Sequence, residues 1–255
     1  MNITPVMLVG AGPGDVDLLT IRALRCIEQA QVIVYDRLVG KEILKLAGRE
    51  CRMIYAGKRK HLHAMSQAQI NAALVEHASA GLRVVRLKGG DPMLFGRVAE
   101  EQAALQAAGL GWELVPGVTA ASGAAASAGL PLTQRGYAQA VTYVTAHRQS
   151  GELDVDWTLL ARHQQTVVVY MGLSVVAELA EQMIARGKPV DTSVTVVFNA
   201  THSDEYIWQT RLDAVSPLPT DAPKGAPAVL IIHPTEIRQS QPHALDLARA
   251  SVSAG

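Results

Sequence analysis

The first half of the chain alternates short apolar runs with segments in which apolar residues recur at helical spacing. The apolar runs predict buried strands over residues 5–9, 32–35, 84–87 and 112–115. The helical spacing predicts helices over residues 18–30, 67–80 and 100–108. Strands that alternate with helices at these distances are typical of a mostly parallel sheet with helices on both faces.

The second half has the same kind of pattern, although it does not repeat the sequence of the first. It predicts strands over residues 141–145, 166–170, 194–198 and 228–232, and an amphipathic helix over residues 173–186. From about residue 239 the pattern dissolves. We therefore predict an N-terminal α/β domain over residues 1–117, a C-terminal α/β domain over residues 118–238, and a loosely ordered tail over residues 239–255.

One long stretch, residues 114–134, carries no charged side chain and has to be weighed as a membrane span. It contains Pro116 and Pro131 and is rich in Gly, Ala, Ser and Thr, so it lacks the bulky apolar residues that face lipid. We interpret it as a segment of close backbone packing, around a ligand or between domains.

Composition narrows the class of protein further. Apolar residues make up 49% of the chain, and its 23 basic and 23 acidic residues cancel. This excludes intrinsic disorder and favours neither a nucleic-acid-binding surface nor a membrane anchor, so we expect no nucleic-acid or membrane partner. Cys26 and Cys51 have neither metal-ligand spacing nor a disulfide framework, and the first residues lack the order of a signal peptide. We expect a cytoplasmic protein.

A glycine-rich turn, residues 10–15, follows the first predicted strand, and Asp36 ends the second. This arrangement resembles a dinucleotide site, with the acidic residue placed for a ribose. However, Pro13 removes a backbone donor and Asp15 puts a carboxylate where a phosphate would sit. The turn therefore favours a neutral or cationic ligand such as S-adenosylmethionine, which has no phosphate. The alternative is a structural turn in which Asp15 caps the next helix.

Nine short motifs now occur in a fixed order. They are VGAGPGD (9–15), YDRLV (35–39), GKR (57–59), VVRLKGGDP (84–92), VPGVTA (115–120), PLT (131–133), YAQ (137–139), YMGL (170–173) and NAT (199–201). On this ordered set, up to about residue 237, the chain resembles the uroporphyrinogen-III C-methyltransferases of the tetrapyrrole methylase superfamily. It is also similar to the methyltransferase module of bifunctional siroheme synthases.

The resemblance implies a homodimer in which each chain has two α/β domains, a mostly parallel first sheet and a cofactor cleft between the domains. The implied reaction transfers two methyl groups from S-adenosylmethionine to uroporphyrinogen III and gives precorrin-2. The implied cofactor-binding residues are Pro13, Gly89, Gly90, Asp91, Leu94, Thr119, Ala120, Met171 and Ala200. Asp36 matches the proton acceptor and Lys58 the proton donor, while Arg97 matches a position credited with substrate binding or proton removal. The identity of the base is therefore open.

The implied substrate is a polyanion, and the chain has basic, acid-free stretches that suit it. Residues 51–75 contain no Asp or Glu, and residues 114–151 contain none either. We expect Arg37, Arg59, Arg135 and His147 to bind the carboxylates of the substrate, although the first basic run could be a solvated loop. His61 and His63 are too close for a helical metal pair, and we expect no metal.

Departures from the family pattern fall mainly on the substrate side. Val98 and Ala99 stand where the family usually has two glycines. Glycines there would permit a positive φ, which Val98 resists. Gln134, Gly136 and Ala140 stand where it usually has a histidine, an aspartate and a serine. Three alternatives therefore stay open: a methylase of a later precorrin, a catalytically silent tetrapyrrole-binding protein, and an NAD-dependent dehydrogenase.

Overall fold

The computed structural model describes residues 4–57, 65–146, 153 and 155–234. The predicted site residues Lys58, Arg59 and His147 lie outside these ranges, as does the predicted tail. The chain divides into two compact units, which we describe separately. The first unit comprises Met1–Ala124, Phe198–Tyr206 and Gly225–Pro227, and the second comprises Ala125–Val197, Ile207–Lys224 and Ala228–Gly255. The division into domains at residue 117 stays a prediction.

The first unit is built on a sheet of five parallel strands. The strands are β1 (Val6–Gly10), β2 (Val32–Tyr35), β3 (Arg52–Tyr55), β4 (Val84–Lys88) and β5 (Trp112–Val115), in the order β3-β2-β4-β1-β5. This confirms the predicted parallel first sheet. The pattern missed β3, because β3 is a short edge strand whose first two residues, Arg52 and Met53, are exposed.

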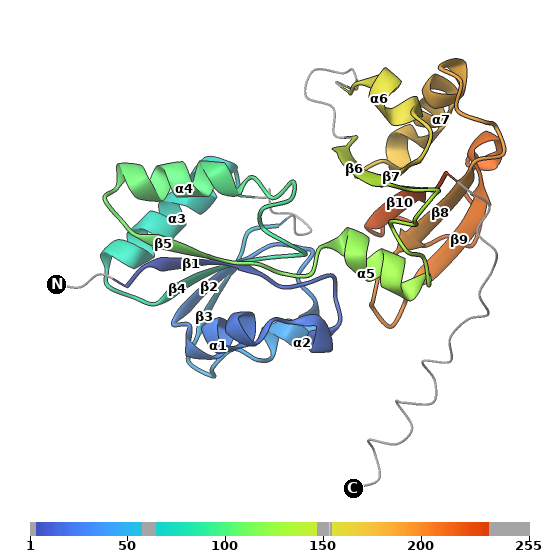
Figure 1. Cartoon of the computed structure of the whole chain (residues 1–255). Helices are drawn as coiled ribbons and strands as arrows, with labels where there is room; N and C mark the ends of the chain where they lie inside the picture. The colour runs from blue at the N-terminus through green and yellow to red at the C-terminus, as the bar shows by residue number, and fades with distance from the viewer. Residues whose placement is uncertain (1–3, 58–64, 147–152, 154, 235–255) are drawn as a thin grey trace, which may run out of the picture. The chain divides into compact units, whose positions relative to one another are not determined.

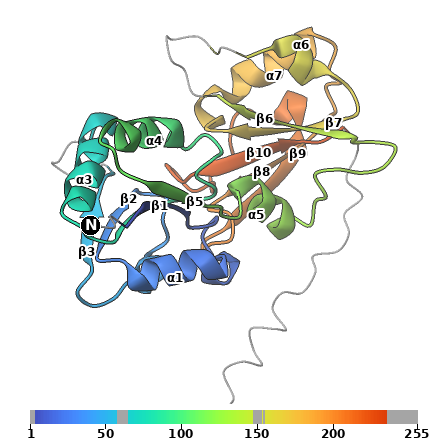
Figure 2. The same cartoon turned by 60° about the vertical axis from the view of Figure 1, so that its left-hand side comes forward.

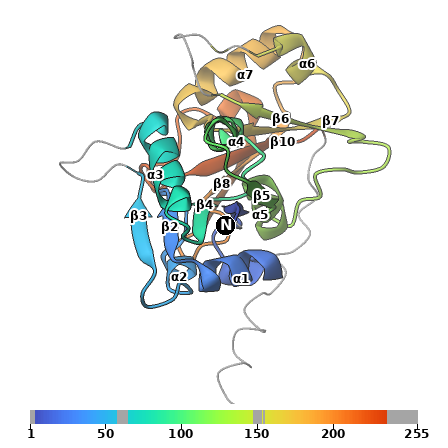
Figure 3. The same cartoon turned by 90° about the vertical axis from the view of Figure 1, so that its left-hand side faces the viewer.

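Helices cover both faces of this sheet, as predicted (Figure 1). Helices α1 (Ile21–Gln29) and α2 (Lys41–Leu44) lie on one face, and α3 (Gln67–Ser79) and α4 (Val98–Ala107) lie on the other (Figure 3). The pleat of the strands separates the two cores: Ile33 of β2 packs toward α1 and α2, whereas Val34 packs toward α3 and α4. A capping box at Ser66 fixes the start of α3.

The second unit is built on a mixed sheet. Its strands are β6 (Ala140–Thr145), β7 (Gln165–Tyr170), β8 (Ser193–Phe198), β9 (Tyr206–Arg211) and β10 (Ala228–Ile232), in the order β6-β7-β10-β8-β9. β6 runs parallel to β7, and β10 runs antiparallel to it. Helices α6 (Trp157–Ala161) and α7 (Val176–Ala185) lie together on one face (Figure 2). The predicted helix over 173–186 is thus a 3-10 turn, Leu173–Val175, followed by α7.

The uncharged stretch contains α5 (Ala120–Ser127), a helix that the pattern did not predict because its small residues show no apolar periodicity. Close packing is nevertheless found there: a Cβ on Gly123 would lie 2.7 Å from the Pro13 ring. Among the described residues no helix is long and apolar enough to cross a membrane. Cys26 and Cys51 are both free thiols, and burial raises the pKa of each.

A buried lysine in the second unit makes stability depend on pH. Lys188 is 3% exposed, donates to the backbone oxygen of Arg162 at 2.9 Å, and has its pKa lowered from 10.5 by burial. Because the folded chain then holds this proton less tightly than the unfolded chain, its contribution to stability is full above 10.5 and falls as pH falls through the lowered pKa.

We therefore expect Lys188→Met to flatten the rise in the free energy of unfolding with pH in the alkaline range below 10.5, measured by urea denaturation. Lys45→Met, at an exposed lysine paired with Glu42, is the control and should leave the slope unchanged. Parallel curves for Lys188→Met and the wild type would contradict the prediction.

Candidate functional site

The candidate site lies at the carboxyl edge of the first sheet, where the loops after β1 and β4 pair with each other. Ala11 donates its N–H to the backbone oxygen of Lys88 at 2.8 Å. Gly12 and Gly90 exchange two backbone hydrogen bonds, at 3.2 and 2.7 Å. In open parallel sheets this edge is where ligands bind. The pairing therefore holds both glycine loops at the place where a ligand is expected.

Three glycines form a cradle in which backbone meets backbone. A Cβ on Gly10 would lie 2.6 Å from the nitrogen of Gly117 and 2.6 Å from the oxygen of Gly90. A Cβ on Gly117 would lie 2.3 Å from the same oxygen of Gly90. No side chain fits at either position, so the end of β1 and the loops after β4 and β5 can approach only as bare backbone. The sequence singled out these glycines, but it did not predict that they contact one another.

A segment far along the chain, residues 199–202, completes the glycine turn from within the same unit. Thr201 Oγ1 accepts the N–H of Asp15 at 3.1 Å, and the His202 ring covers Gly14 so closely that a Cβ there would lie 2.4 Å from it. The carboxylate of Asp15 caps the short 3-10 helix Val16–Leu18 by accepting from Asp17. The capping role considered for Asp15 is thus present, at a 3-10 helix rather than at α1.

Backbone strain gathers in the same loops. In the described part of the first unit, four residues other than glycine have positive φ: Phe95 (53°), Arg97 (54°), Asn199 (46°) and Thr201 (66°). Such a conformation costs of order 1–3 kcal/mol per residue and is typical of binding and active sites. The positive φ lies at Arg97, just before α4, and Val98 is the first residue of the helix, buried against the core. Val98 itself is helical, so a β-branched side chain is accommodated at a position where the family usually has glycine.

The loop after β2 brings Asp36 to this edge. Asp36 Oδ1 accepts the N–H of Leu38 at 3.0 Å, which fixes the carboxylate in a local turn. Leu38 in turn covers the next glycine loop, because a Cβ on Gly89 would lie 2.6 Å from the Cβ of Leu38. Asp36 therefore lies in the loop packed directly against the predicted cofactor-binding residues Gly89 and Gly90.

Beneath this edge the structure holds a buried ionic cluster that the sequence analysis missed. Glu101 Oε1 accepts from Arg86 Nε and from Lys88 Nζ, each at 2.9 Å. Arg86 Nη2 also lies 3.5 Å from Asp36 Oδ2. Burial and the neighbouring Arg86 lower the pKa of Lys88 from 10.5, against the opposing effect of Glu101. Two charges at alternate positions of an otherwise apolar strand, β4, were the signal in the sequence.

Arg97 is exposed and paired. Its Nε and Nη2 donate to the two carboxylate oxygens of Glu100 at 2.7 and 2.8 Å, a bidentate contact that raises the pKa of Arg97 and lowers that of Glu100. A guanidinium whose pKa is raised stays protonated. Arg97 is therefore suited to attract an anion, and it is unsuited to accept a proton.

Most of the predicted cofactor-binding residues belong to the first unit and lie in the loops after β1, β4 and β5, at the start of α5, or in the segment 199–202. They are Pro13, Gly89, Gly90, Asp91, Leu94, Thr119, Ala120 and Ala200. Met171 belongs to the second unit, where it follows β7 with a positive φ of 55°. Arg37 is exposed and donates to the backbone oxygen of Gly225 at 3.4 Å, and Arg135 is exposed in a turn of the second unit.

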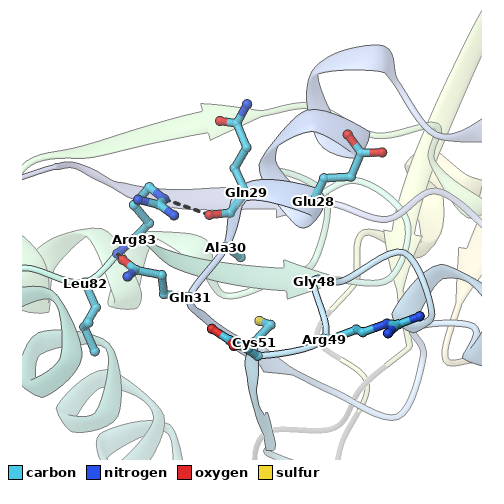
Figure 4. A pocket seen from close by; sticks show the side chains of 10 residues that line it. Glu28, Gln29, Ala30, Gln31, Gly48, Arg49, Cys51, Leu82 and Arg83 are labelled. Carbon is cyan, nitrogen blue, oxygen red and sulfur yellow. Dashed lines mark hydrogen bonds between the residues drawn. The ribbon is translucent and has the colours of Figure 1, made fainter.

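A pocket of about 540 Å³ lies at the opposite, amino edge of the first sheet (Figure 4). Its lining comes from the end of α1 and from the residues just before β2, β3 and β4, with Arg83 donating to the backbone oxygen of Gln29 at 2.7 Å. None of the predicted site residues lines it. We place the candidate site at the carboxyl edge instead, because the glycine loops, the strain and Asp36 meet there.

The loops of the site are unsuited to a pyrophosphate. Residues 10–15, 89–94 and 116–120 contain no Lys, Arg or His, although His202 of the segment 199–202 covers Gly14. The N–H of Asp15 is already bonded to Thr201, and α1 begins only at Ile21, with Thr20 as its cap. The helix N-terminus on which dinucleotide sites depend is therefore absent from the turn. Among the described residues, no group of three His, Cys, Asp or Glu side chains is placed to hold a metal ion.

We expect Gly10→Ala to lower the free energy of unfolding by about 1–3 kcal/mol, because the added methyl group must push three backbone segments apart. Chemical denaturation measures this. Gly48→Ala is the control, since its Cβ would meet only the Glu28 oxygen at an ordinary 3.6 Å. Equal stability of the two variants would show that the cradle can relax.

Comparison with known proteins gives the family. A family model of tetrapyrrole (corrin/porphyrin) methylases matches residues 5–216. The chain is 49% identical over 227 residues to the siroheme synthase of Chromobacterium violaceum and 48% identical to that of Nitrosospira multiformis. Both alignments cover 89% of this chain and 48% of the relative, so the chain spans about half the length of these relatives.

Solved structures agree with this result. The uroporphyrin-III C-methyltransferase of Thermus thermophilus, complexed with S-adenyl homocysteine, is 38% identical with a TM-score of 0.77 and covers 90% of this chain and 97% of its own. A cobalt precorrin-4 methyltransferase of cobalamin biosynthesis is 27% identical with a TM-score of 0.81, covering 89% and 94%. Together with the glycine cradle and the two-unit fold, these matches show that the chain belongs to the tetrapyrrole methylase family.

Proposed function

We propose that the chain methylates ring carbons of uroporphyrinogen III with S-adenosylmethionine, in two transfers that give precorrin-2. The observation that carries the proposal is the 38% identity to the Thermus thermophilus uroporphyrin-III C-methyltransferase over nearly the whole of that enzyme. The siroheme synthases also support the proposal, since they are 48–49% identical to this chain over about half of their own length.

The site fits the methyl donor. The loops that meet at the glycine cradle carry no basic side chain over residues 10–15, 89–94 and 116–120, which suits a ligand with a sulfonium and an ammonium and without phosphate. Bound there, S-adenosylmethionine supplies an electrophilic methyl group. The residues proposed to hold it in the first unit are those of the loops that begin at Gly10, Gly89 and Gly117, together with Ala200. Contact of the donor with Met171 stays a prediction.

Asp36 is the residue of the first unit best placed to remove a proton. It is a carboxylate at the sheet edge, its side chain is 29% exposed, and it lies in the loop that packs on Gly89. Arg97 is the protonated partner for a carboxylate of the substrate, and Arg37 and Arg135 are exposed cations that suit the same polyanion. The acid role of Lys58 and the binding roles of Arg59 and His147 stay predictions.

A later-precorrin methylase is the second candidate. The observation in its favour is the TM-score of 0.81 to the cobalt precorrin-4 methyltransferase, which exceeds the 0.77 of the Thermus thermophilus enzyme. Backbone similarity reports the shared fold, however, and the side chains that select a substrate are better compared by sequence identity. The identities, 38% against 27%, favour uroporphyrinogen III.

The test is a methyl-transfer assay with labelled S-adenosylmethionine and each tetrapyrrole in turn, supplied in the reduced state. We expect label in uroporphyrinogen III and a product with the mass and spectrum of precorrin-2. Label in a later precorrin alone would replace the proposed substrate. Binding of a tetrapyrrole without transfer would favour a catalytically silent protein. Retention of NADH without S-adenosylmethionine would favour a dehydrogenase.

The proposed assembly and location follow from the family and the composition. We expect a homodimer, which light scattering of the purified chain tests. We also expect a cytoplasmic location. We expect methyl transfer to need no metal, and activity that survives treatment with a chelator would support this.

A further inference from the structure

The buried cluster of Arg86, Lys88 and Glu101 has no role in the chemistry proposed so far. Its side chains are almost fully inaccessible, with exposed fractions of 4%, 6% and 0%. Arg86 and Lys88 occupy alternate positions of β4 and so point to the same face of the sheet, the face that α4 covers (Figure 3). That face is otherwise lined by apolar residues such as Val34 and Leu105.

Stability alone is a poor reason for such a cluster. Removing several charges from water costs several kcal/mol per ion, and well-packed apolar residues in their place are often equally stable or more stable. Glu101 Oε2, moreover, is buried with no hydrogen-bond partner among the described residues. We therefore expect the cluster to hold another side chain in place.

The contacts of Arg86 point to the site. Nε donates to Glu101, Nη1 donates to the backbone oxygens of Val34 at 3.3 Å and Leu87 at 3.0 Å, and Nη2 faces Asp36 Oδ2 at 3.5 Å. Val34 is the cross-strand partner of Arg86, and Asp36 follows two residues later on the same side of the chain. All three guanidinium nitrogens therefore have partners, and Nη2, which is directed toward the edge of the sheet, contacts Asp36.

The exposed fraction of the side chains increases from Glu101 through Arg86 to Asp36. Glu101 and Arg86 are buried, whereas the Asp36 side chain is 29% exposed at the carboxyl edge. The charges also balance: two cations, Arg86 and Lys88, stand against two carboxylates, Glu101 and Asp36. Gln67 Nε2 also donates to Glu101 Oε1, at 3.4 Å, and it is neutral.

We propose that Glu101 is a positioning residue: through Arg86 it sets the distance and direction of the Asp36 carboxylate for proton removal. The inference rests on the proposed function, since it assigns Asp36 to the reaction. By anchoring Nε from α4, Glu101 holds the guanidinium back from full bidentate pairing with Asp36. Oδ1 of Asp36 then stays bonded to the Leu38 N–H, while Oδ2 keeps only the long, 3.5 Å contact with Arg86 Nη2.

The decisive test is a double-mutant cycle on kcat, with uroporphyrinogen III as substrate. Glu101→Gln should lower kcat about tenfold to hundredfold, the range expected when a reacting group is displaced by about 1 Å. KM for S-adenosylmethionine and the Kd of S-adenosylhomocysteine should not change. In an Asp36→Asn background the same substitution should change kcat by less than about twofold. An equal loss in both backgrounds would mean that Glu101 acts independently of Asp36 and would overturn the proposal.

A second variant covers the case in which Glu101→Gln fails to fold. The triple variant Arg86→Met/Lys88→Met/Glu101→Leu replaces the whole cluster by apolar residues and should keep the stability of the wild type. We expect it to bind S-adenosylhomocysteine and to lose kcat to the same degree. Wild-type kcat in this folded variant would overturn the proposal.

Two comparisons keep this inference separate from the proposed function. Glu113→Gln, at an exposed carboxylate paired with Arg22, is the matched control and should retain full kcat. A wild-type chain that transfers no methyl group to uroporphyrinogen III would refute the proposed function itself. An active wild type with additive Asp36 and Glu101 effects would refute only the positioning role. Partial recovery of kcat in Glu101→Asp, which restores the charge, is expected as well.

Discussion

Glu101→Gln is expected to lower the free energy of unfolding by about 3–5 kcal/mol, the range found when one partner of a buried ion pair is removed. The glutamine keeps the shape of the side chain but no longer carries the charge. Arg86 and Lys88 would then remain as two buried cations without their shared carboxylate. Urea denaturation at neutral pH, followed by circular dichroism, measures the change.

Two comparisons isolate the cause of that loss. Glu100→Gln changes the adjacent carboxylate, whose pair with Arg97 is exposed, and should shift stability by less than about 1 kcal/mol. Lys88→Met combined with Glu101→Gln should recover part of the loss, because one uncompensated cation is removed together with the carboxylate. A Glu101→Gln variant as stable as Glu100→Gln would mean that water or a rearranged side chain neutralises the cluster.

Asp36→Asn is expected to lower kcat about 10²–10⁴-fold, the usual contribution of a general base. Asparagine retains an oxygen that can accept the Leu38 N–H, so the local turn at Asp36 should persist. The substitution therefore removes basicity and charge while it preserves the fold of the loop. Activity should not vanish, since holding the reactants in line contributes about 7–11 kcal/mol and outweighs a single base.

Steady-state rates of methyl transfer, measured with saturating donor, give the size of this effect. The matched control is Asp213→Asn, at a carboxylate of the second unit that pairs with Arg211, and it should behave as the wild type. The affinity of Asp36→Asn for S-adenosylhomocysteine should also be retained. If Asp36→Asn keeps the kcat of the control, the base is another group, and Lys58 becomes the next residue to substitute.

Regular elements with a strong pattern could be predicted from the sequence. The apolar runs at residues 32–35 and 228–232 coincide with the interior strands β2 and β10, because a strand buried on both faces is apolar nearly throughout. The edge strands β3 and β9 were missed for the converse reason. In β9, half-buried Tyr206, Trp208 and Thr210 alternate with exposed residues, and charged and polar side chains weaken the signal.

The candidate site, too, could be predicted only in part from the sequence. The sequence contained the glycine turn, Asp36 and the order of the family motifs, and Pro13 and Asp15 argued against a pyrophosphate. It did not show that residues 199–202 close over that turn, since Thr201 and Asp15 are 186 positions apart. It also gave Arg97 two possible roles, and the pairing with Glu100, which raises the pKa of Arg97, favours the role of a cation.

By itself the sequence therefore determined the parallel first sheet and the main helices that cover it, because these depend on local periodicity. Only the tertiary structure decided which backbones touch at Gly10, Gly90 and Gly117, and which carboxylate neutralises Arg86 and Lys88. Contacts of this kind join residues far apart in the chain, and their energy depends on burial and distance, which no local pattern records.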